Sequence, residues 1–260
     1  FFMGASLNPR LGNVDMKMFA EGRLSWILFY YITISCVMKQ YEELGYVSSP
    51  LVLVATGHWL YANAVMKGEE RITTTWDIFY EKWGWMLIYW NLAGVPFIYS
   101  LQSVYLYKVG PTSHPVWYLA LVYAILFTAY YIWDTANSQK NYFRMDLNGS
   151  FRERLTFPQL PWRKLKNPKY LKTEAGSALL VDGWWKYARK IHYTADITMA
   201  TCWGLACGFG SFIPYFYCLF FTCALTHRTI RDMERCGKKY GQDWVRYCKE
   251  VPYIFIPGIY

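Results

Sequence analysis

The chain has 260 residues, of which 54% are hydrophobic, 20% aromatic and only 17% charged. A soluble domain usually carries about 25% charged residues and rarely exposes large apolar patches, so this composition argues against an ordinary soluble domain, a disordered chain or a disulfide-rich secreted protein. The net charge of +9 allows anionic partners, but alone it does not separate nucleic acid, acidic lipid and a phosphorylated cofactor.

Long stretches without charged residues follow one another along the chain. They are 24–38, 47–66, 83–107, 109–133 and 197–226. A helix needs about 20 apolar residues to cross the hydrocarbon core of a membrane. The last stretch is too long for one simple span, and the glycines and proline within 204–214 predict two short helices, 197–207 and 213–226. We therefore predict an all-α, polytopic membrane protein with about six transmembrane helices.

Basic residues are concentrated in two of the intervening segments. Segment 135–195 holds twelve Lys and Arg against four acidic residues, and the tail from His227 holds seven against four. Because basic loops tend to stay in the cytosol, we expect both segments on the cytosolic side.

Several familiar catalytic patterns are absent from the sequence. It has no GxGxxG or GxxxxGK[ST] phosphate cradle, and no GxSxG or HExxH element. The seven cysteines form no CxxC pair and mostly lie in apolar stretches, where they are more typical of small buried residues than of metal ligands. We expect no metal and no nucleic-acid partner.

The first polar pattern is Lys140 and Arg144, four residues apart. On a helix they would share one face and could hold a phosphate. A positively charged flank of a membrane helix explains the same pair equally well.

A second pattern lies in segment 179–196. If this segment is helical, an aromatic residue, a cation, an imidazole, a phenol and a carboxylate share one face: Trp185, Arg189, His192, Tyr193 and Asp196. An interfacial aromatic belt with snorkelling cations would explain the tryptophan and the arginine. It does not explain Asp196 at the start of an apolar stretch, where acidic groups are functional candidates.

A third pattern follows the last apolar stretch. Four charged side chains are spaced to share one helix face: Arg228, Asp232, Arg235 and Lys239. Cations in this register suit a pyrophosphate or a 2′-phosphate, and Arg favours bidentate contacts. The alternative is a solvated basic helix with an Asp–Arg pair.

Three ordered segments resemble the sterol reductase family of polytopic membrane enzymes, which includes C14, C7 and C24 reductases and the lamin B receptor. The opening Gly4-Ala-Ser-Leu-Asn-Pro-Arg10 resembles the family's G-x-x-L-N-P-R element, and 179–196 resembles its LLxxGWWxxxRxxxYxxD signature. Residues 231–253 resemble the family's C-terminus. Most members read RHPNY where this chain reads Arg-Lys-Ile-His-Tyr at 189–193, a form similar to fungal Δ24(24(1))-sterol reductases.

The resemblance implies NADPH as hydride donor and a sterol side-chain double bond, C24(28)/24(24(1)), as acceptor, which is the last step of ergosterol biosynthesis. It implies a multi-pass endoplasmic reticulum membrane protein that takes its sterol from the bilayer among membrane lipids. Residues 1–134 would form a four-span part contributing to the sterol pocket, and 135–260 the NADPH-binding segments with a short helical hairpin at 197–226. The alternatives are a C14 or C7 reductase, or a non-catalytic sterol-binding scaffold.

The resemblance also implies roles for individual residues. Asp232 and Tyr193 are expected to form the acid apparatus. Since neighbouring cations would keep Asp232 ionised, it should orient a tyrosine or water rather than act alone. The residues expected at the cofactor are Lys140, Arg144, Trp185, Arg189, His192, Tyr193, Asp196, Arg228, Asp232, Arg235, Cys236, Lys239 and Tyr240. Because family members begin upstream of the opening signature and this chain begins with Phe1, we expect it to lack N-terminal spans.

Overall fold

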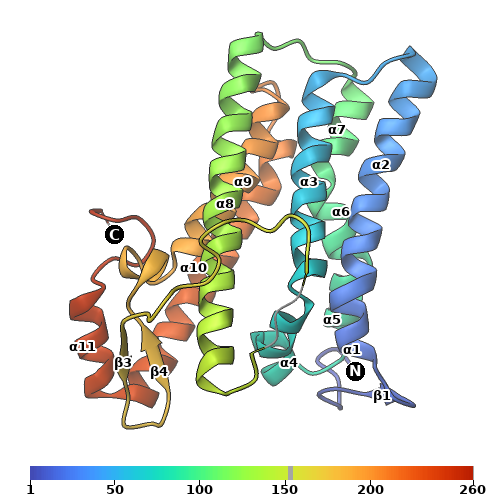
Figure 1. The fold of residues 1–260 in the computed structure, drawn as a ribbon. Helices are drawn as coiled ribbons and strands as arrows, with labels where there is room; N and C mark the ends of the chain where they lie inside the picture. Colours follow the sequence, from blue (N-terminus) through green and yellow to red (C-terminus); the bar gives the residue numbers. More distant parts are fainter. Residues whose placement is uncertain (152–154, 260) are drawn as a thin grey trace. The chain divides into compact units, whose positions relative to one another are not determined.

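The computed structural model describes residues 1–151 and 155–259, so Arg152 and Arg154 of the basic segment lie outside the described residues. The described chain is mostly helical, as predicted (Figure 1). The helices are α1 Met16–Phe19, α2 Ser25–Leu44, α3 Ser49–Lys67, α4 Trp76–Tyr80, α5 Trp85–Tyr89, α6 Val95–Tyr99, α7 Leu101–Val109, α8 Val116–Leu147, α9 Ile191–Ala206, α10 Ile213–Tyr240 and α11 Gln242–Glu250. The strands are β1 Arg10–Leu11, β2 Val14–Asp15, β3 Tyr170–Lys172 and β4 Ala178–Leu180.

The chain divides into two compact units. The N-terminal unit comprises 1–123 and 202–217, and the C-terminal unit comprises 124–201 and 218–260. Each unit is described by itself below.

In the N-terminal unit, helix α2 packs against α3, α6 and α7. Its core is aromatic, and a buried polar chain runs through it, since Thr33 Oγ1 lies 2.8 Å from His58 Nδ1 and 3.3 Å from Ser103 Oγ. The His58 ring also meets the buried Trp203 ring edge-on, with the centroids 4.6 Å apart. Pairing polar side chains with one another allows them to be buried among apolar helices without a large desolvation cost.

The opening signature segment has a structural role in this unit. Gly4 has φ +81°, and a Cβ atom there would come within 2.6 Å of the Gly84 nitrogen. The amide of Trp83 donates to the Ser6 carbonyl (2.9 Å), and Asn8 Nδ2 donates to the Ile78 carbonyl (3.3 Å). The close backbone approach therefore requires glycine at position 4.

Helix α8 is the one helix among the described residues that is long and apolar enough to cross a membrane. Large apolar side chains on its first turns are exposed, among them Trp117 and Leu121. The predicted span 83–107 is instead divided among α5, α6 and α7, joined by a π-helical segment at Trp90–Gly94 and a break at Ser100. Six transmembrane helices remain a prediction.

The interpretation of 179–196 as one helix is wrong. Residues 178–180 form β4, Gly183–Lys186 form a 3₁₀ turn, and α9 begins only at Ile191. The Asp182 carboxylate accepts hydrogen bonds from the amides of Gly183 (2.7 Å) and Lys169 (3.1 Å), and Gly183 has φ +60°. This side-chain cap and the left-handed glycine turn the chain out of the strand, which a helix-periodicity argument cannot detect.

Candidate functional site

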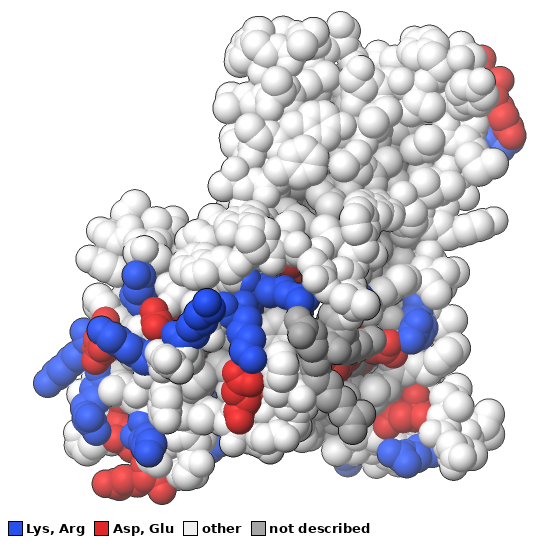
Figure 2. All heavy atoms as spheres, viewed as in Figure 1, with Lys and Arg blue, Asp and Glu red and all other residues white. Residues whose placement is uncertain are grey.

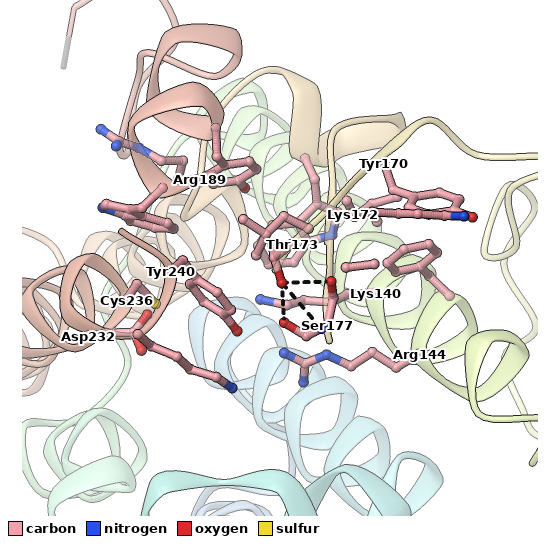
Figure 3. Close-up of a pocket in the computed structure, with 18 of the residues that line it drawn as sticks. Lys140, Arg144, Tyr170, Lys172, Thr173, Ser177, Arg189, Asp232, Cys236 and Tyr240 are labelled. Carbon is pink, nitrogen blue, oxygen red and sulfur yellow. Dashed lines mark hydrogen bonds between the residues drawn. The ribbon is translucent and has the colours of Figure 1, made fainter. Parts of the chain in front are cut away.

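A cavity of about 680 Å³ lies within the C-terminal unit (Figure 3). Its walls come from the polar end of α8, the β3–β4 hairpin, the 3₁₀ turn with the residues that follow it, the last turns of α10, and α11. On the face of this unit seen in Figure 2, charged side chains gather over the hairpin and α11, while the apolar part of α8 shows none.

Helix α8 continues beyond its apolar stretch and presents one face to the cavity. Lys140, Phe143, Arg144 and Leu147 line the cavity, at spacings of three and four residues. Helical geometry therefore places the two cations one turn apart on the same wall.

The paired tryptophans of the second signature attach the 3₁₀ turn to α8. Trp185 Nε1 donates to the Ala136 carbonyl (2.9 Å), and Trp184 Nε1 donates to Thr135 Oγ1 (2.8 Å). Gln139 Oε1 accepts the backbone N–H of Trp184 at 3.0 Å, and a Cβ atom at Gly183 would come within 2.3 Å of the same oxygen. The Gly-Trp-Trp sequence is thus explained by close packing on α8.

Lys140 is the most unusual cation at the cavity. Its ammonium lies 4.0 Å from the centroid of the Trp185 ring, a cation–π contact. No carbonyl or carboxylate within residues 1–151 and 155–259 accepts a hydrogen bond from it. Burial, with the positive charges of Arg144 and Lys190 nearby, lowers the pKa of Lys140 well below its ordinary value.

Asp232 is held between two cations. Its carboxylate forms an ion pair with Lys190 and accepts from Arg235 Nη2 at 2.7 Å. Burial alone would raise the pKa of Asp232, but the charge and hydrogen bond of Lys190 and the neighbouring Lys140 outweigh burial, so the pKa is lowered. Asp232 is therefore ionised near neutral pH.

The α10 wall continues from Asp232 for two further turns. Arg235, Cys236, Lys239 and Tyr240 line the cavity there. Burial and the nearby Asp232 raise the pKa of the Cys236 thiol, so this thiol is not activated as a nucleophile.

Arg189 lines the cavity, and both terminal nitrogens of its guanidinium contact C-terminal residues. Its Nη1 lies 2.5 Å from Cys248 Sγ, and its Nη2 donates to the Pro252 carbonyl at 3.1 Å. Its backbone N–H donates to the Tyr253 carbonyl at 3.0 Å. This arginine connects the second signature to the C-terminal tail, so its guanidinium mainly serves the fold.

Of the residues predicted at the cofactor, nine line the cavity: Lys140, Arg144, Trp185, Arg189, Asp232, Arg235, Cys236, Lys239 and Tyr240. Four do not: His192, Tyr193, Asp196 and Arg228.

Two of these four lie directly behind the cavity wall. The His192 ring lies 5.0 Å from that of Trp185, and the Tyr193 ring lies 5.6 Å from the ammonium of Lys190. Burial and the nearby cations Lys140 and Lys190 lower the pKa of His192, so its imidazole is neutral.

Sequence reasoning missed several residues of the cavity wall. Lys190 pairs with Asp232, but it lies off the helix face assumed for 179–196. The others come from the hairpin and α11, namely Tyr170, Lys172, Thr173, Ser177, Trp244 and Tyr247. They reach the cavity through long-range pairing and packing, for which a linear spacing pattern gives no signal.

The fold and the cavity define a helical protein with a cavity rich in Lys and Arg beside an apolar helix. The chain matches the ergosterol biosynthesis ERG4/ERG24 family over residues 1–260, and it belongs to this family of sterol reductases, which confirms the predicted resemblance.

Three curated relatives, two from fungi and one from a bacterium, illustrate the match. The Delta(24(24(1)))-sterol reductase erg4A of Aspergillus fumigatus is 48% identical over 99% of this chain and 55% of its own length. The Delta(24(24(1)))-sterol reductase of Gibberella zeae is 48% identical over 100% of this chain and 44% of its own. The Delta(14)-sterol reductase of Methylotuvimicrobium alcaliphilum is 42% identical, with 100% and 58% covered. The chain therefore spans about half the length of these relatives.

Proposed function

We propose that this protein reduces a sterol side-chain double bond with NADPH, the Δ24(24(1)) reduction that ends ergosterol biosynthesis. The cavity is the observation that supports the proposal. Its lining includes six Lys and Arg side chains besides Arg189 and a single carboxylate, together with aromatic rings. This balance suits a polyanionic dinucleotide with planar bases, since cations bind phosphates and aromatic rings stack on bases.

The surroundings of Lys140 show whether the residues at the cavity suit such an anionic cofactor. No acceptor among the described residues receives a hydrogen bond from Lys140, and burial and like charges outweigh the nearby Asp232 charge and work against its charged form. A buried cation of this kind is costly unless an anion completes its surroundings. Lys140, Arg144 and Lys239 would hold phosphate groups, and Trp185 and Tyr240 are the candidate stacking surfaces.

NADPH would supply the hydride, and the chain's own residues would manage the proton. An isolated alkene must gain a proton before it accepts hydride, so an acid is required near the double bond. An ionised Asp232 cannot be that acid alone. It is placed to orient a water or a phenol that delivers the proton, and Tyr193, which lies beside its partner Lys190, is our candidate phenol.

The sterol is proposed to enter from the bilayer. Large exposed apolar side chains on α8, such as Trp117 and Leu121, support a lipid environment. We further propose that the protein has about six transmembrane helices and lies in the endoplasmic reticulum membrane. Residues 83–107 would line the sterol pocket. The names of the two fungal relatives favour the side chain as the reduced position, and the Delta(14)-sterol reductases make C14 reduction the alternative.

The test is a sterol profile of cells that lack this protein, with re-expressed wild type as control. Accumulation of a 24(28)-unsaturated sterol, reversed by re-expression, supports the proposal. Accumulation of a 14-unsaturated sterol would assign the alternative instead. An unchanged profile, with sterol still bound by the purified protein, would indicate a non-catalytic scaffold.

A further inference from the structure

The β3–β4 hairpin forms a wall of the cavity, and its tip is a closed turn. Thr173 and Ser177 face each other across the turn, with Thr173 N donating to the Ser177 carbonyl (2.9 Å) and Thr173 Oγ1 to the same oxygen (2.8 Å). Gly176 N donates to the Thr173 carbonyl (3.0 Å), which Gly176 allows by its φ of +77°. Thr173, Gly176 and Ser177 all line the cavity. Thr173 and Ser177 lie on the side of Lys140 and Arg144 (Figure 3).

The two faces of the hairpin pack against different elements. Leu180 and Ala178 belong to the cluster of Phe143 and Trp185 on the α8 side. Leu171 and Leu179 pack against Val251, Tyr247 and Trp244, so they face α11 and the tail. Alternation along a strand produces this division, and the hairpin is therefore a thin layer between two walls of the cavity.

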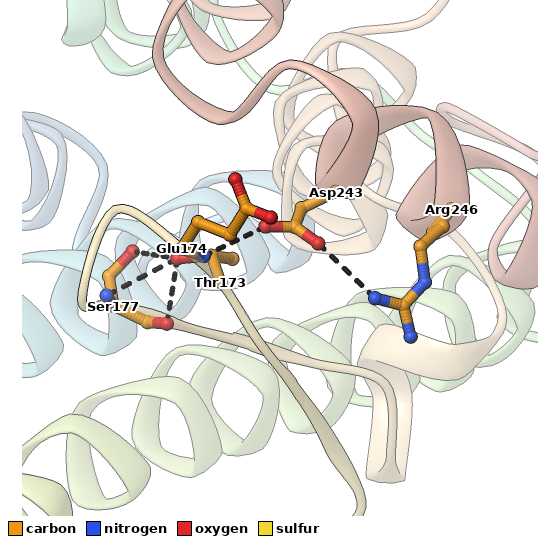
Figure 4. A network of polar contacts seen from close by, with 5 residues as sticks. All are labelled: Thr173, Glu174, Ser177, Asp243 and Arg246. Carbon is orange, nitrogen blue, oxygen red and sulfur yellow. Dashed lines mark hydrogen bonds and ion pairs between the residues drawn. The ribbon is translucent and has the colours of Figure 1, made fainter.

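One side chain of α11 joins that helix to the tip of the hairpin. Asp243 Oδ2 accepts the backbone N–H of Glu174 at 2.9 Å, across 69 positions of sequence (Figure 4). Its other oxygen accepts from Arg246 Nη1 at 3.2 Å. The Asp243 side chain is 12% exposed and that of Arg246 is 65% exposed. Among the described residues, this is the single hydrogen bond between the turn and α11.

Helix α11 is itself part of the site. Trp244 and Tyr247, one and four positions after Asp243, line the cavity, and Cys248 accepts from Arg189. The contact from Asp243 to the turn therefore connects two cavity walls that are distant in sequence. A buried charged acceptor is strong enough to hold such a turn in place.

We propose that Asp243 is a positioning residue for the cofactor. It fixes the 173–177 turn against α11, and it thereby sets the position of Lys172 at the end of β3, where this lysine lines the cavity. The role rests on the proposed function, because the ligand positioned is the anionic cofactor. Asp243 does not line the cavity, so its effect is transmitted through the turn.

The test uses the whole protein with Asp243→Ala, Asp243→Asn and the matched control Arg246→Ala. Asp243→Ala removes the acceptor of the Glu174 amide. Arg246→Ala removes the exposed ion pair but leaves that acceptor. Asp243→Asn keeps an oxygen acceptor without the charge. The readouts are KM for NADPH and kcat from steady-state reduction, and hydrogen exchange of the 173–177 amides in the protein without NADPH.

We expect the 173–177 amides of Asp243→Ala to exchange faster than those of wild type. KM for NADPH should rise about tenfold, which is in the range expected for the loss of one charged hydrogen bond, while kcat stays within about twofold of wild type. Asp243→Asn should recover most of the affinity, and Arg246→Ala should behave as wild type. Faster exchange in Asp243→Ala with an unchanged KM would overturn the positioning role. An equal rise of KM in Arg246→Ala would assign the effect to the ion pair instead.

The hydrogen-exchange readout separates this proposal from the proposed function. If wild-type protein binds no NADPH, the proposed function fails, whatever the turn does. If wild type binds NADPH, and Asp243→Ala exchanges faster at the turn without NADPH but binds NADPH equally well, only the role of Asp243 fails.

Discussion

Two lysines, one in each unit, show how differently the same side chain can be accommodated. In the N-terminal unit, the fully buried Lys17 donates to the carbonyls of Asp77 (2.7 Å), Ile78 (3.2 Å) and Glu81 (2.7 Å). These carbonyls lie at the C-terminal end of α4, where a cation also complements the helix dipole. In the C-terminal unit, Lys140 lies against a tryptophan ring, with two like charges and the Asp232 carboxylate nearby, and no oxygen of the described residues accepts a hydrogen bond from its ammonium.

The difference separates a structural cation from a ligand-binding cation. Burial lowers the pKa of both lysines, so a lowered pKa alone does not distinguish them. The surroundings do. Lys17 has its donors satisfied within the fold, whereas Lys140 lines a cavity, where the anionic ligand we propose would supply the acceptor that the described residues do not provide.

The largest effect is expected from Lys17→Met. This change keeps the methylene packing but removes the ammonium from one buried and two partly buried hydrogen bonds to carbonyl oxygens, which should cost about 3 kcal/mol or more of stability. We expect a clearly lowered Tm in thermal unfolding of the purified protein. Lys39→Met removes an exposed pair with Glu42 and serves as control, with little expected change. A Tm equal to that of the control would mean that Lys17 is not a structural cation.

Next is Asp232→Asn, which removes the charge between Lys190 and Arg235 but keeps the shape. We expect turnover to fall by about 10²-fold or more, as is typical when an acid–base group is lost. NADPH affinity, measured on the same purified protein by fluorescence titration, should stay close to wild type. Near-normal turnover would assign Asp232 to structure and move the search for the acid apparatus to Tyr193 and the sterol pocket.

The sequence predicted the parts of the site that depend on local helical geometry. Lys140 with Arg144, and Asp232 with Arg235 and Lys239, each share one face of a single helix, as the spacing of three and four requires, and both faces line the cavity. Arg228 was grouped with them, but it lies one turn too early in α10 to line the cavity.

What the spacing patterns could not supply were the contacts between distant segments. The second signature was assigned to a helix, because nothing in 179–196 shows that β4 will pair with β3 or that Gln139 will accept from Trp184. For the same reason, the spacing patterns did not predict that Lys172 and Tyr247 line the cavity. Lys17 was also missed, since a lone lysine in a polar segment gives no sign that it will cap α4.

A smaller effect should distinguish cations at the cavity from their neighbours on α10. Lys239 lines the cavity, and the adjacent Lys238 is exposed outside it. If Lys239 contacts the 2′-phosphate, Lys239→Met should raise KM for NADPH more than KM for NADH, by about 1–3 kcal/mol, while Lys238→Met changes neither. Equal loss with both cofactors would remove Lys239 from the 2′-phosphate.

The smallest expected effect is a pH dependence of NADPH affinity, which we expect from Lys140 and not from Lys17. Without ligand, the pKa of Lys140 lies well below the ordinary 10.5. A bound phosphate favours the charged lysine and raises this pKa. Below the lowered pKa, Lys140 is protonated with and without ligand, so it adds no pH dependence. Above it, binding must take up a proton, and the affinity for NADPH should fall as pH rises, by at most about tenfold per pH unit.

The contribution of Lys140 to folding stability should change with pH in the direction opposite to that of the NADPH affinity. Between the lowered pKa of Lys140 and that of the unfolded chain, the unfolded state binds more protons, so the contribution of this residue to stability increases as pH rises. Lys140→Met should flatten both trends, which dissociation constants and Tm values across the alkaline range would show. If Lys140→Met keeps the wild-type slope in NADPH affinity, the proton taken up on binding belongs to another group, and Lys140 is then a structural cation in the same sense as Lys17.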